Sequence, residues 1–180
     1  MVNFMWENLF RRGDQDRDVL EALRHTVVFE SLSNHELRFL QTTCHVRTFK
    51  GGEAIFRQGE IGVGMYIILR GSLEIFVDHQ LDEEAPSKLH MVTQLRAGDF
   101  LGELSLVENN SRRTATAIAA EESVLIGFFK PDLLEILERQ PATGVKILLR
   151  LSEVLGRRLK ETTTKISELK LELQRMSEKV

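Results

Sequence analysis

The chain has 180 residues, of which 42% are hydrophobic and 28% charged, and its formal net charge at pH 7 is −3. These values are ordinary for a soluble globular protein of one domain plus an appendage, and they give no basic footprint for nucleic acid. The lone cysteine, Cys44, excludes a disulfide framework within one chain and fits a reducing cytosol, so a cytoplasmic protein is expected.

The N-terminal part of the chain is predicted to be helical. The apolar stretch Met1–Phe10 is too short for a membrane span and lacks a small-residue cleavage site, so neither a signal peptide nor a membrane contact is expected. It is typical of an amphipathic segment that packs on the domain or on a second chain. Apolar spacing predicts a helix over Asp16–Arg24. Ser33 and Glu36 form a capping-box pattern, which predicts a second helix that ends near Cys44.

Short apolar runs separated by glycine characterise the middle of the chain, from Val46 to Phe129, and such runs predict β-strands. The expected strands are Ile55–Phe56, Met65–Leu69, Leu73–Val77, Met91–Leu95, Thr114–Ala119 and Val124–Phe129. The acidic stretch Asp78–Lys88 contains Pro86 and has no periodicity, which is typical of an exposed hairpin loop. Several short strands at this spacing predict an antiparallel barrel or jelly roll, in a mainly β fold flanked by helices.

The longest helical signal begins after Pro141, beyond a short helix expected over Pro131–Leu137. Residues at alternating spacings of three and four form a seam, namely Val145, Leu148, Ser152, Leu155, Leu159, Thr162, Ile166, Leu169, Leu173, Met176 and Val180. Nine of these eleven positions are apolar, with Lys and Glu on the flanks, which predicts a coiled coil. At about 1.5 Å per residue the helix would be on the order of 55 Å long. One small barrel cannot cover that length, so we expect a parallel homodimer.

One stretch, Gly98–Ala119, combines the groups that would bind a sugar phosphate. Backbone N–H groups of a short helix opening at Gly102 would point outward and cradle an anion. Arg112 and Arg113 follow, and a guanidinium offers phosphate oxygens a planar fork of donors. Glu103 is too close to a phosphate to help bind it, and would instead accept hydrogen bonds from a sugar hydroxyl. Arginine, helix end and acid together predict a sugar-phosphate pocket.

This stretch resembles the phosphate-binding cassette of the cyclic nucleotide-binding domain family, whose pattern is G-E-L-A-L, a short spacer and R-[ASTR]-A-[TS]. Here the pattern reads Gly102-Glu103-Leu104-Ser105-Leu106 and then Arg113-Thr114-Ala115-Thr116. Ser111 stands where a proline often precedes the arginine, and the Arg112–Arg113 pair leaves the register open by one residue. The R-T-A-T alignment and the ten-residue offset from Glu103 favour Arg113, and Arg112 is the alternative.

The similarity runs from about Val27 to at least Ile166 and is closest to Crp/Fnr-like sensor domains. It implies a β jelly-roll barrel with N-terminal helices and a long C-terminal coiled-coil helix. Residues 1–26 would form an N-terminal helical segment, 27–140 the cyclic nucleotide-binding domain and 141–180 the dimerisation helix.

The resemblance also assigns roles in ligand binding. Thr114 would contact the phosphate or, as in cyclic GMP-selective domains, the guanine amino group. The run from Gly156 to Ile166 resembles the central helix of bacterial cyclic AMP receptor proteins, in which adjacent hydroxyl residues bind adenine from both chains of the dimer. Thr162 and Thr163 occupy those positions, whereas Arg158 matches an arginine close to the cassette glutamate. A threonine at a seam position also has simpler uses, since it can set the register or bond back to its own helix.

Cyclic AMP is therefore the preferred ligand, and cyclic GMP stays open. The expected ligand-binding residues are Gly102, Glu103, Leu104, Ser105, Arg112, Arg113, Thr114, Arg158, Thr162 and Thr163.

The expected function is that of a sensor that signals through its dimerisation helix to a separate, unidentified protein. The five histidines show no metal-ligand spacing and the chain has no nucleophile elbow, so no metal, cofactor or enzyme activity is expected. Transcription-factor relatives continue into a helix-turn-helix module, whereas this chain stops at Val180, so nucleic-acid binding is not expected. Two alternatives stay open: a ligand-blind dimerisation adaptor, and a divergent Crp-like transcription regulator that lacks its DNA-binding module.

Overall fold

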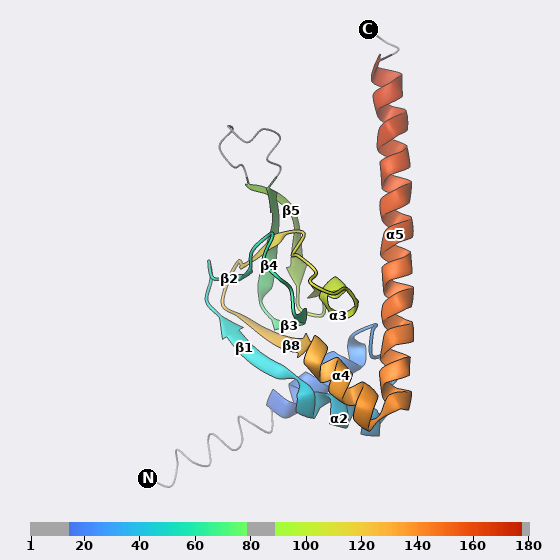
Figure 1. Ribbon diagram of the computed structural model, residues 1–180. Coiled ribbons are helices and arrows are strands. Elements are labelled where there is room, and N and C mark those ends of the chain that lie inside the picture. Colours follow the sequence, from blue (N-terminus) through green and yellow to red (C-terminus); the bar gives the residue numbers. More distant parts are fainter. Residues whose placement is uncertain (1–14, 79–88, 178–180) are drawn as a thin grey trace.

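The computed structural model describes residues 15–78 and 89–177 (Figure 1). Within these residues, two four-stranded antiparallel sheets form a jelly-roll barrel, and helices lie at one side of it. The expected jelly-roll fold with flanking helices is confirmed. The predicted apolar segment Met1–Phe10, and the predicted hairpin loop apart from Asp78, lie outside the described residues.

The two sheets have the strand orders β1-β8-β3-β6 and β2-β7-β4-β5. Their strands are β1 (His45–Phe49), β2 (Ala54–Phe56), β3 (Gly64–Arg70), β4 (Ser72–Asp78), β5 (Leu89–Arg96), β6 (Phe100–Leu101), β7 (Thr116–Ala119) and β8 (Ser123–Phe129). All six predicted strands are present. The sequence did not predict β1 or β6, because β1 is exposed at every residue but its last and β6 is only two residues long.

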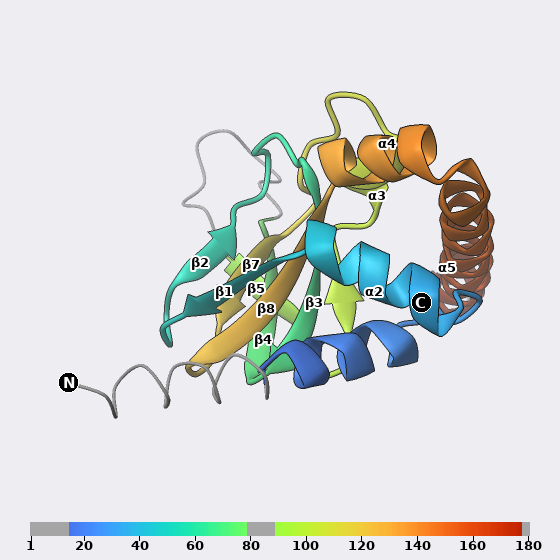
Figure 2. The ribbon, with the colours of Figure 1, turned by 90° about the horizontal axis from the view of Figure 1, so that it is seen from below.

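The helices comprise residues 15–25, α2 (Asn34–Thr43), α3 (Leu104–Val107), α4 (Lys130–Arg139) and α5 (Pro141–Ser177). The predicted capping box of α2 is confirmed. The Ser33 backbone N–H donates to Glu36 Oε2 at 2.7 Å, and the Glu36 N–H donates to Ser33 Oγ at 3.3 Å. In Figure 2, α2 and α4 reach from the barrel towards α5, so these helices place the long helix beside the barrel.

Two apolar clusters hold this arrangement together. One fills the interior of the barrel around Phe49, Ile68 and Leu73. The other lies between the sheet and the helices, where it includes Ile147 and Leu151 of α5, both fully buried. The start of α5 is therefore part of the core, and this packing fixes the position of the helix relative to the barrel.

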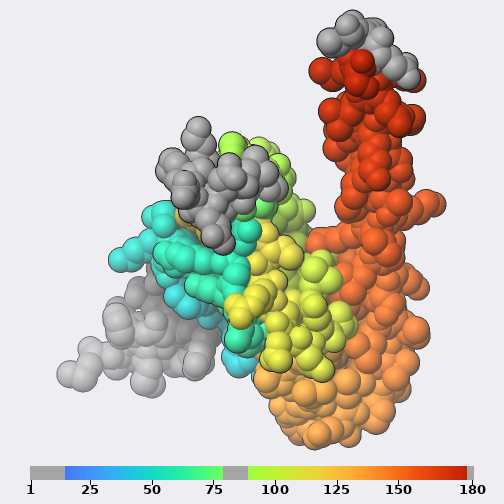
Figure 3. All heavy atoms as spheres, turned by 45° about the horizontal axis from the view of Figure 1, so that its top comes forward, coloured from blue at the N-terminus to red at the C-terminus, as the bar shows by residue number. Residues whose placement is uncertain are grey.

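The rest of α5 leaves the domain. Every described residue after Leu155 is exposed, including the seam residues Leu159, Ile166 and Leu173. Figure 3 shows this part of the helix projecting beyond the barrel. No helix in the described part of the chain is both long enough and apolar enough to cross a membrane.

Candidate functional site

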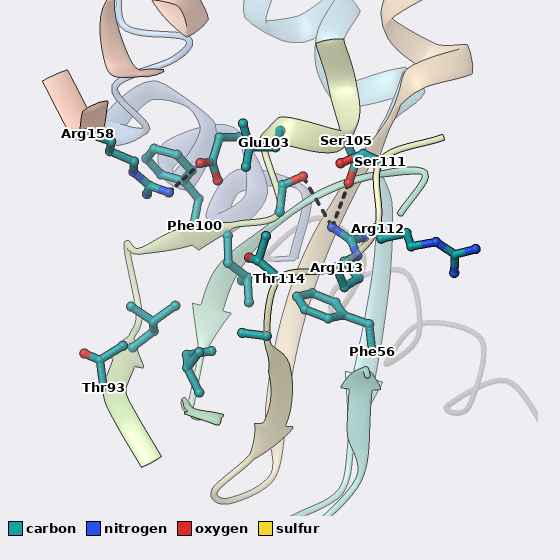
Figure 4. A pocket seen from close by; sticks show the side chains of 16 residues that line it. Phe56, Thr93, Phe100, Glu103, Ser105, Ser111, Arg112, Arg113, Thr114 and Arg158 are labelled. Carbon is teal, nitrogen blue, oxygen red and sulfur yellow. Dashed lines mark hydrogen bonds and ion pairs between the residues drawn. The ribbon is translucent and has the colours of Figure 1, made fainter. Parts of the chain in front are cut away.

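A cavity of about 450 Å³ opens between the barrel and the side of α5. Its lining comes from β2, β4, β5, β6, α3, the segment 111–115 and one residue of α5 (Figure 4). The lining residues are Phe56, Ile75, Thr93, Leu95, Phe100, Leu101, Gly102, Glu103, Leu104, Ser105, Ser111, Arg112, Arg113, Thr114, Ala115 and Arg158. Eight of the ten residues expected to bind ligand are among them, so the fold gathers the cassette and the start of the exposed helix around one space.

Arg113 is the charged centre of this cavity. Its side chain is only 7% exposed, and its Nη1 donates to Ser105 Oγ at 3.2 Å and to the Gly102 carbonyl at 3.3 Å (Figure 4). Burial lowers the pKa of this guanidinium, although nearby Tyr66 and Glu103 act in the opposite direction. Among the described residues, no carboxylate forms a salt bridge with it. A buried cation that faces a cavity and has no counter-ion among these residues can attract an anion.

Arg112 has a different environment. Its side chain is exposed, extends away from the cavity in Figure 4, and its Nη1 donates to the Gly59 carbonyl at 2.7 Å. Ser111 before it is buried and donates its hydroxyl to Glu108 at 2.8 Å. The segment thus turns one arginine inward and the other outward.

Two glycines allow Arg113 to lie so close to the backbone. Gly102 has a φ of +79°, and a Cβ there would lie 2.2 Å from Arg113 Nη1. A Cβ on Gly62 would lie 2.1 Å from Ser105 Oγ and 3.0 Å from Arg113 Nε. The sequence showed Gly62 only as part of a glycine-rich corner, because nothing in the chain indicates that this corner touches the cassette.

The short helix α3 provides less free backbone than the sequence suggested. The amides of Ser105 and Leu106 donate to the carbonyls of Gly102 and Glu103, at 3.2 and 3.0 Å. The expected backbone cradle would therefore rest on the amides that come before them, together with the Ser105 hydroxyl.

Glu103 connects the cassette to α5. It is 4% exposed and accepts a hydrogen bond from Arg158 Nη1 at 2.5 Å. The Arg158 guanidinium also lies over the Phe100 ring, 5.0 Å from its centroid. Because Arg158 is on α5 and Glu103 opens α3, this ion pair joins the wall of the cavity to the long helix (Figure 4).

Thr162 and Thr163 do not reach the cavity within one chain. Both are exposed, and their hydroxyls donate to the carbonyls of Arg158 and Leu159 on their own helix, each at 2.8 Å. Their contact with a base stays a prediction that involves a second chain. Thr114 and Leu104, by contrast, line the cavity.

The sequence did not single out Phe56, Phe100 or Thr93 as site residues. Phe56 ends β2 and Thr93 is on β5, so only the pairing of distant strands brings them to the cassette. In the described residues, no group of three or more His, Cys, Asp or Glu side chains is placed to hold a metal ion.

Comparison with known proteins gives a consistent result. Residues 46–140 match the family model described as the cyclic nucleotide-binding domain. The chain is 28% identical over 150 residues to the cyclic AMP receptor protein of Thermus thermophilus, covering 83% of this chain and 65% of that protein. It is 33% identical over 135 residues to a cAMP-dependent protein kinase regulatory subunit of Mycosarcoma maydis, covering 75% of this chain and 23% of that one.

Among solved structures, the Thermus thermophilus catabolite activator protein superposes with a TM-score of 0.69 at 26% identity. The superposition covers 80% of this chain and 63% of that chain. This chain therefore spans somewhat less than two thirds of the length of these bacterial relatives.

Proposed function

This chain belongs to the cyclic nucleotide-binding domain family, and we propose that it is a sensor that binds cyclic AMP in the cavity beside Arg113. The observation that supports this most strongly is the Arg113 guanidinium itself, which is buried beside Ser105 and is paired with no carboxylate of the described residues. A cyclic nucleotide carries a single negative charge on its phosphate, which would compensate this cation.

In the proposed complex the phosphate accepts hydrogen bonds from Arg113, Ser105 and Thr114. One carboxylate oxygen of Glu103 accepts a hydrogen bond from Arg158. The carboxylate also accepts a hydrogen bond from the ribose 2′-hydroxyl. The base lies towards the apolar part of the cavity, which includes Ile75, Leu95 and Phe100. Thr162 of one chain and Thr163 of a second would then close over the base. Cyclic GMP is the second candidate ligand, because Thr114 lines the cavity and a threonine there suits a guanine amino group.

The output would pass through α5. Arg158 ties the helix to the cassette, so a ligand that bonds to Glu103 changes the contacts at the root of the exposed seam. Contacts that differ between the free and the bound state would shift the register or the separation of two paired helices. A downstream protein would bind the two arrangements differently. We propose a cytoplasmic regulator without enzymatic activity, in line with relatives named as a receptor and a regulatory subunit.

Calorimetric titration of the unmodified chain, Arg113→Ala and Arg112→Ala with cyclic AMP and cyclic GMP tests the proposal. Each charge-assisted hydrogen bond is worth roughly 1.5–3 kcal/mol, so Arg113→Ala should weaken binding at least tenfold. Arg112→Ala, whose side chain is exposed, should bind within about twofold of the unmodified chain.

Two results would contradict the proposal. If Arg112→Ala lost affinity and Arg113→Ala did not, the assignment of the phosphate-binding arginine would be wrong by one residue. If the unmodified chain gave no heat with either nucleotide, the barrel would serve only as a scaffold for dimerisation.

A further inference from the structure

Arg113 is buried, and no carboxylate within residues 15–78 and 89–177 pairs with it, yet one face of its guanidinium is covered. The Phe56 ring lies beneath it, with 4.1 Å between Arg113 Cζ and the ring centroid (Figure 4). The negative face of an aromatic ring attracts a guanidinium, and the attraction grows when water is excluded from the contact. Phe56 therefore stabilises the buried cation without neutralising its charge.

The Phe56 ring is itself held in place by other aromatic residues. It stacks against Tyr66, with centroids 6.3 Å apart and planes inclined at 29°. Tyr66 in turn packs edge-on against Phe49 and Phe129, with centroid distances of 6.5 and 5.8 Å. The ring under Arg113 is therefore held by neighbouring aromatic side chains that pack against the barrel core.

An aromatic ring differs from a carboxylate because it leaves the N–H groups and the charge of the guanidinium available to a ligand. A carboxylate would accept the guanidinium N–H groups and neutralise the charge that must attract a phosphate. A ring contacts only the flat face, so the N–H groups at the edge stay directed towards Ser105, Gly102 and the cavity. The positive charge is kept buried and oriented, but it is not cancelled.

We propose that Phe56 is a positioning residue for ligand binding, which acts through Arg113 by holding its guanidinium flat against the ring. The inference rests on the proposed function, since it assumes that Arg113 binds the ligand phosphate. If Phe56 were only a filler of volume, the electrostatic character of its ring would have no effect on the ligand.

Fluorinated phenylalanines at position 56 test this directly, because one, two and three ring fluorines reduce the negative potential of the ring face at nearly constant shape. The dissociation constant for cyclic AMP should rise stepwise, by about tenfold across the series. The same series at Phe49, whose ring lies 4.3 Å from Arg47 outside the cavity, is the matched control and should leave the constant unchanged. A flat series at position 56 would overturn the proposal.

A second measurement does not depend on ligand or on any substitution at Phe56. In the unliganded protein, the ring current of Phe56 should shift the Arg113 Nε–H resonance upfield, with the assignment made from Arg113→Lys. An unshifted resonance would overturn the proposal. If the unmodified chain bound no nucleotide, the proposed function would fail, and this spectrum would still decide whether Phe56 holds Arg113.

Discussion

At the scale of single residues, the cavity contrasts two arginines that both lie on phenylalanine rings. Arg158 stacks on Phe100 and also pairs with Glu103. Arg113 stacks on Phe56 and has no such pair among the described residues. Only Arg113 therefore keeps an uncompensated charge for a ligand, while Arg158 fixes the acid that would bind the sugar.

Removing Arg158 should damage both binding and stability. Arg158→Ala leaves the buried Glu103 carboxylate without its partner, which typically costs about 1–3 kcal/mol. Calorimetry with cyclic AMP and urea unfolding should both show a loss. Arg157→Ala, which removes the neighbouring exposed arginine, should change neither by more than about 0.5 kcal/mol. Equal effects of the two variants would mean that the ion pair has no special importance.

Glu36 provides a pH-dependent link between α2 and α5. Lys146 Nζ donates to both its carboxylate oxygens, at 2.8 and 2.9 Å, and these bonds lower the pKa of Glu36 from 4.5 to about 2. Because the folded pKa lies below the unfolded one, the carboxylate stabilises the fold above about pH 4.5. That contribution is lost as the pH falls from 4.5 towards 2.

Glu36→Gln should therefore lower the free energy of unfolding at neutral pH, by an amount on the order of 3 kcal/mol at most. Glutamine can still complete the capping box with Ser33, so the comparison isolates the charge. Urea unfolding between pH 7 and pH 2 should show the two proteins converging at the acid end. Parallel curves over the whole range would contradict the assigned role of Lys146.

Whether the sequence predicts a contact depends on how far apart along the chain the two residues lie. The capping box and the glycine of the cassette were visible, because their partners lie within a few residues. Phe56 under Arg113, Gly62 beside Ser105 and Lys146 on Glu36 were not, because these pairs meet only through the packing of separate elements. The sequence named the charged groups of the site but not the surfaces that hold them.

At the scale of elements, α5 has two halves with different environments. Ile147 and Leu151 anchor its first turns in the core, and Val154 is the last buried residue. The apolar period predicted the whole helix, since the seam continues unbroken through both halves. It did not reveal the residue at which α5 stops packing against the domain, because the same apolar spacing suits packing against the barrel and pairing with another helix.

Gly156 lies at this boundary, in the exposed part of a continuous helix. Apart from the backbone of its own helix, an added Cβ would meet no described atom within 4 Å, so packing among the described residues does not require a glycine. Gly156→Ala should raise the stability by roughly 0.5–1 kcal/mol, seen as a higher urea midpoint with an unchanged slope. A lower midpoint would instead reveal a close neighbour at this position, such as a paired helix.

At the scale of the whole molecule, most of the apolar seam on α5 is not covered by any other element of the described chain. Six of the eleven seam residues are apolar and between 47% and 70% exposed, namely Val145, Leu159, Ile166, Leu169, Leu173 and Met176. A parallel pair of helices would bury them against their equivalents, in keeping with the heptad spacing. Leu171 is exposed as well but lies on the opposite side of the heptad.

Leu169, which lies in the seam, and Leu171, which lies outside it, allow a matched test of dimerisation. Leu169→Lys places a charge in the seam and should convert a dimer into a monomer by analytical ultracentrifugation at micromolar concentration. Leu171→Lys makes the same chemical change outside the seam and should leave the mass unchanged. Dissociation by both variants, or by neither, would argue against the predicted seam.

In the proposed function, the buried charge of Arg113 binds the phosphate of a cyclic nucleotide. Calorimetric titrations of one preparation with cyclic AMP and with adenosine, which has the base and ribose but no phosphate, test this contact. Cyclic AMP should bind at least tenfold more tightly than adenosine, because only cyclic AMP can form the charge-assisted bonds. Equal affinity for the two compounds would show that the cavity does not recognise the phosphate.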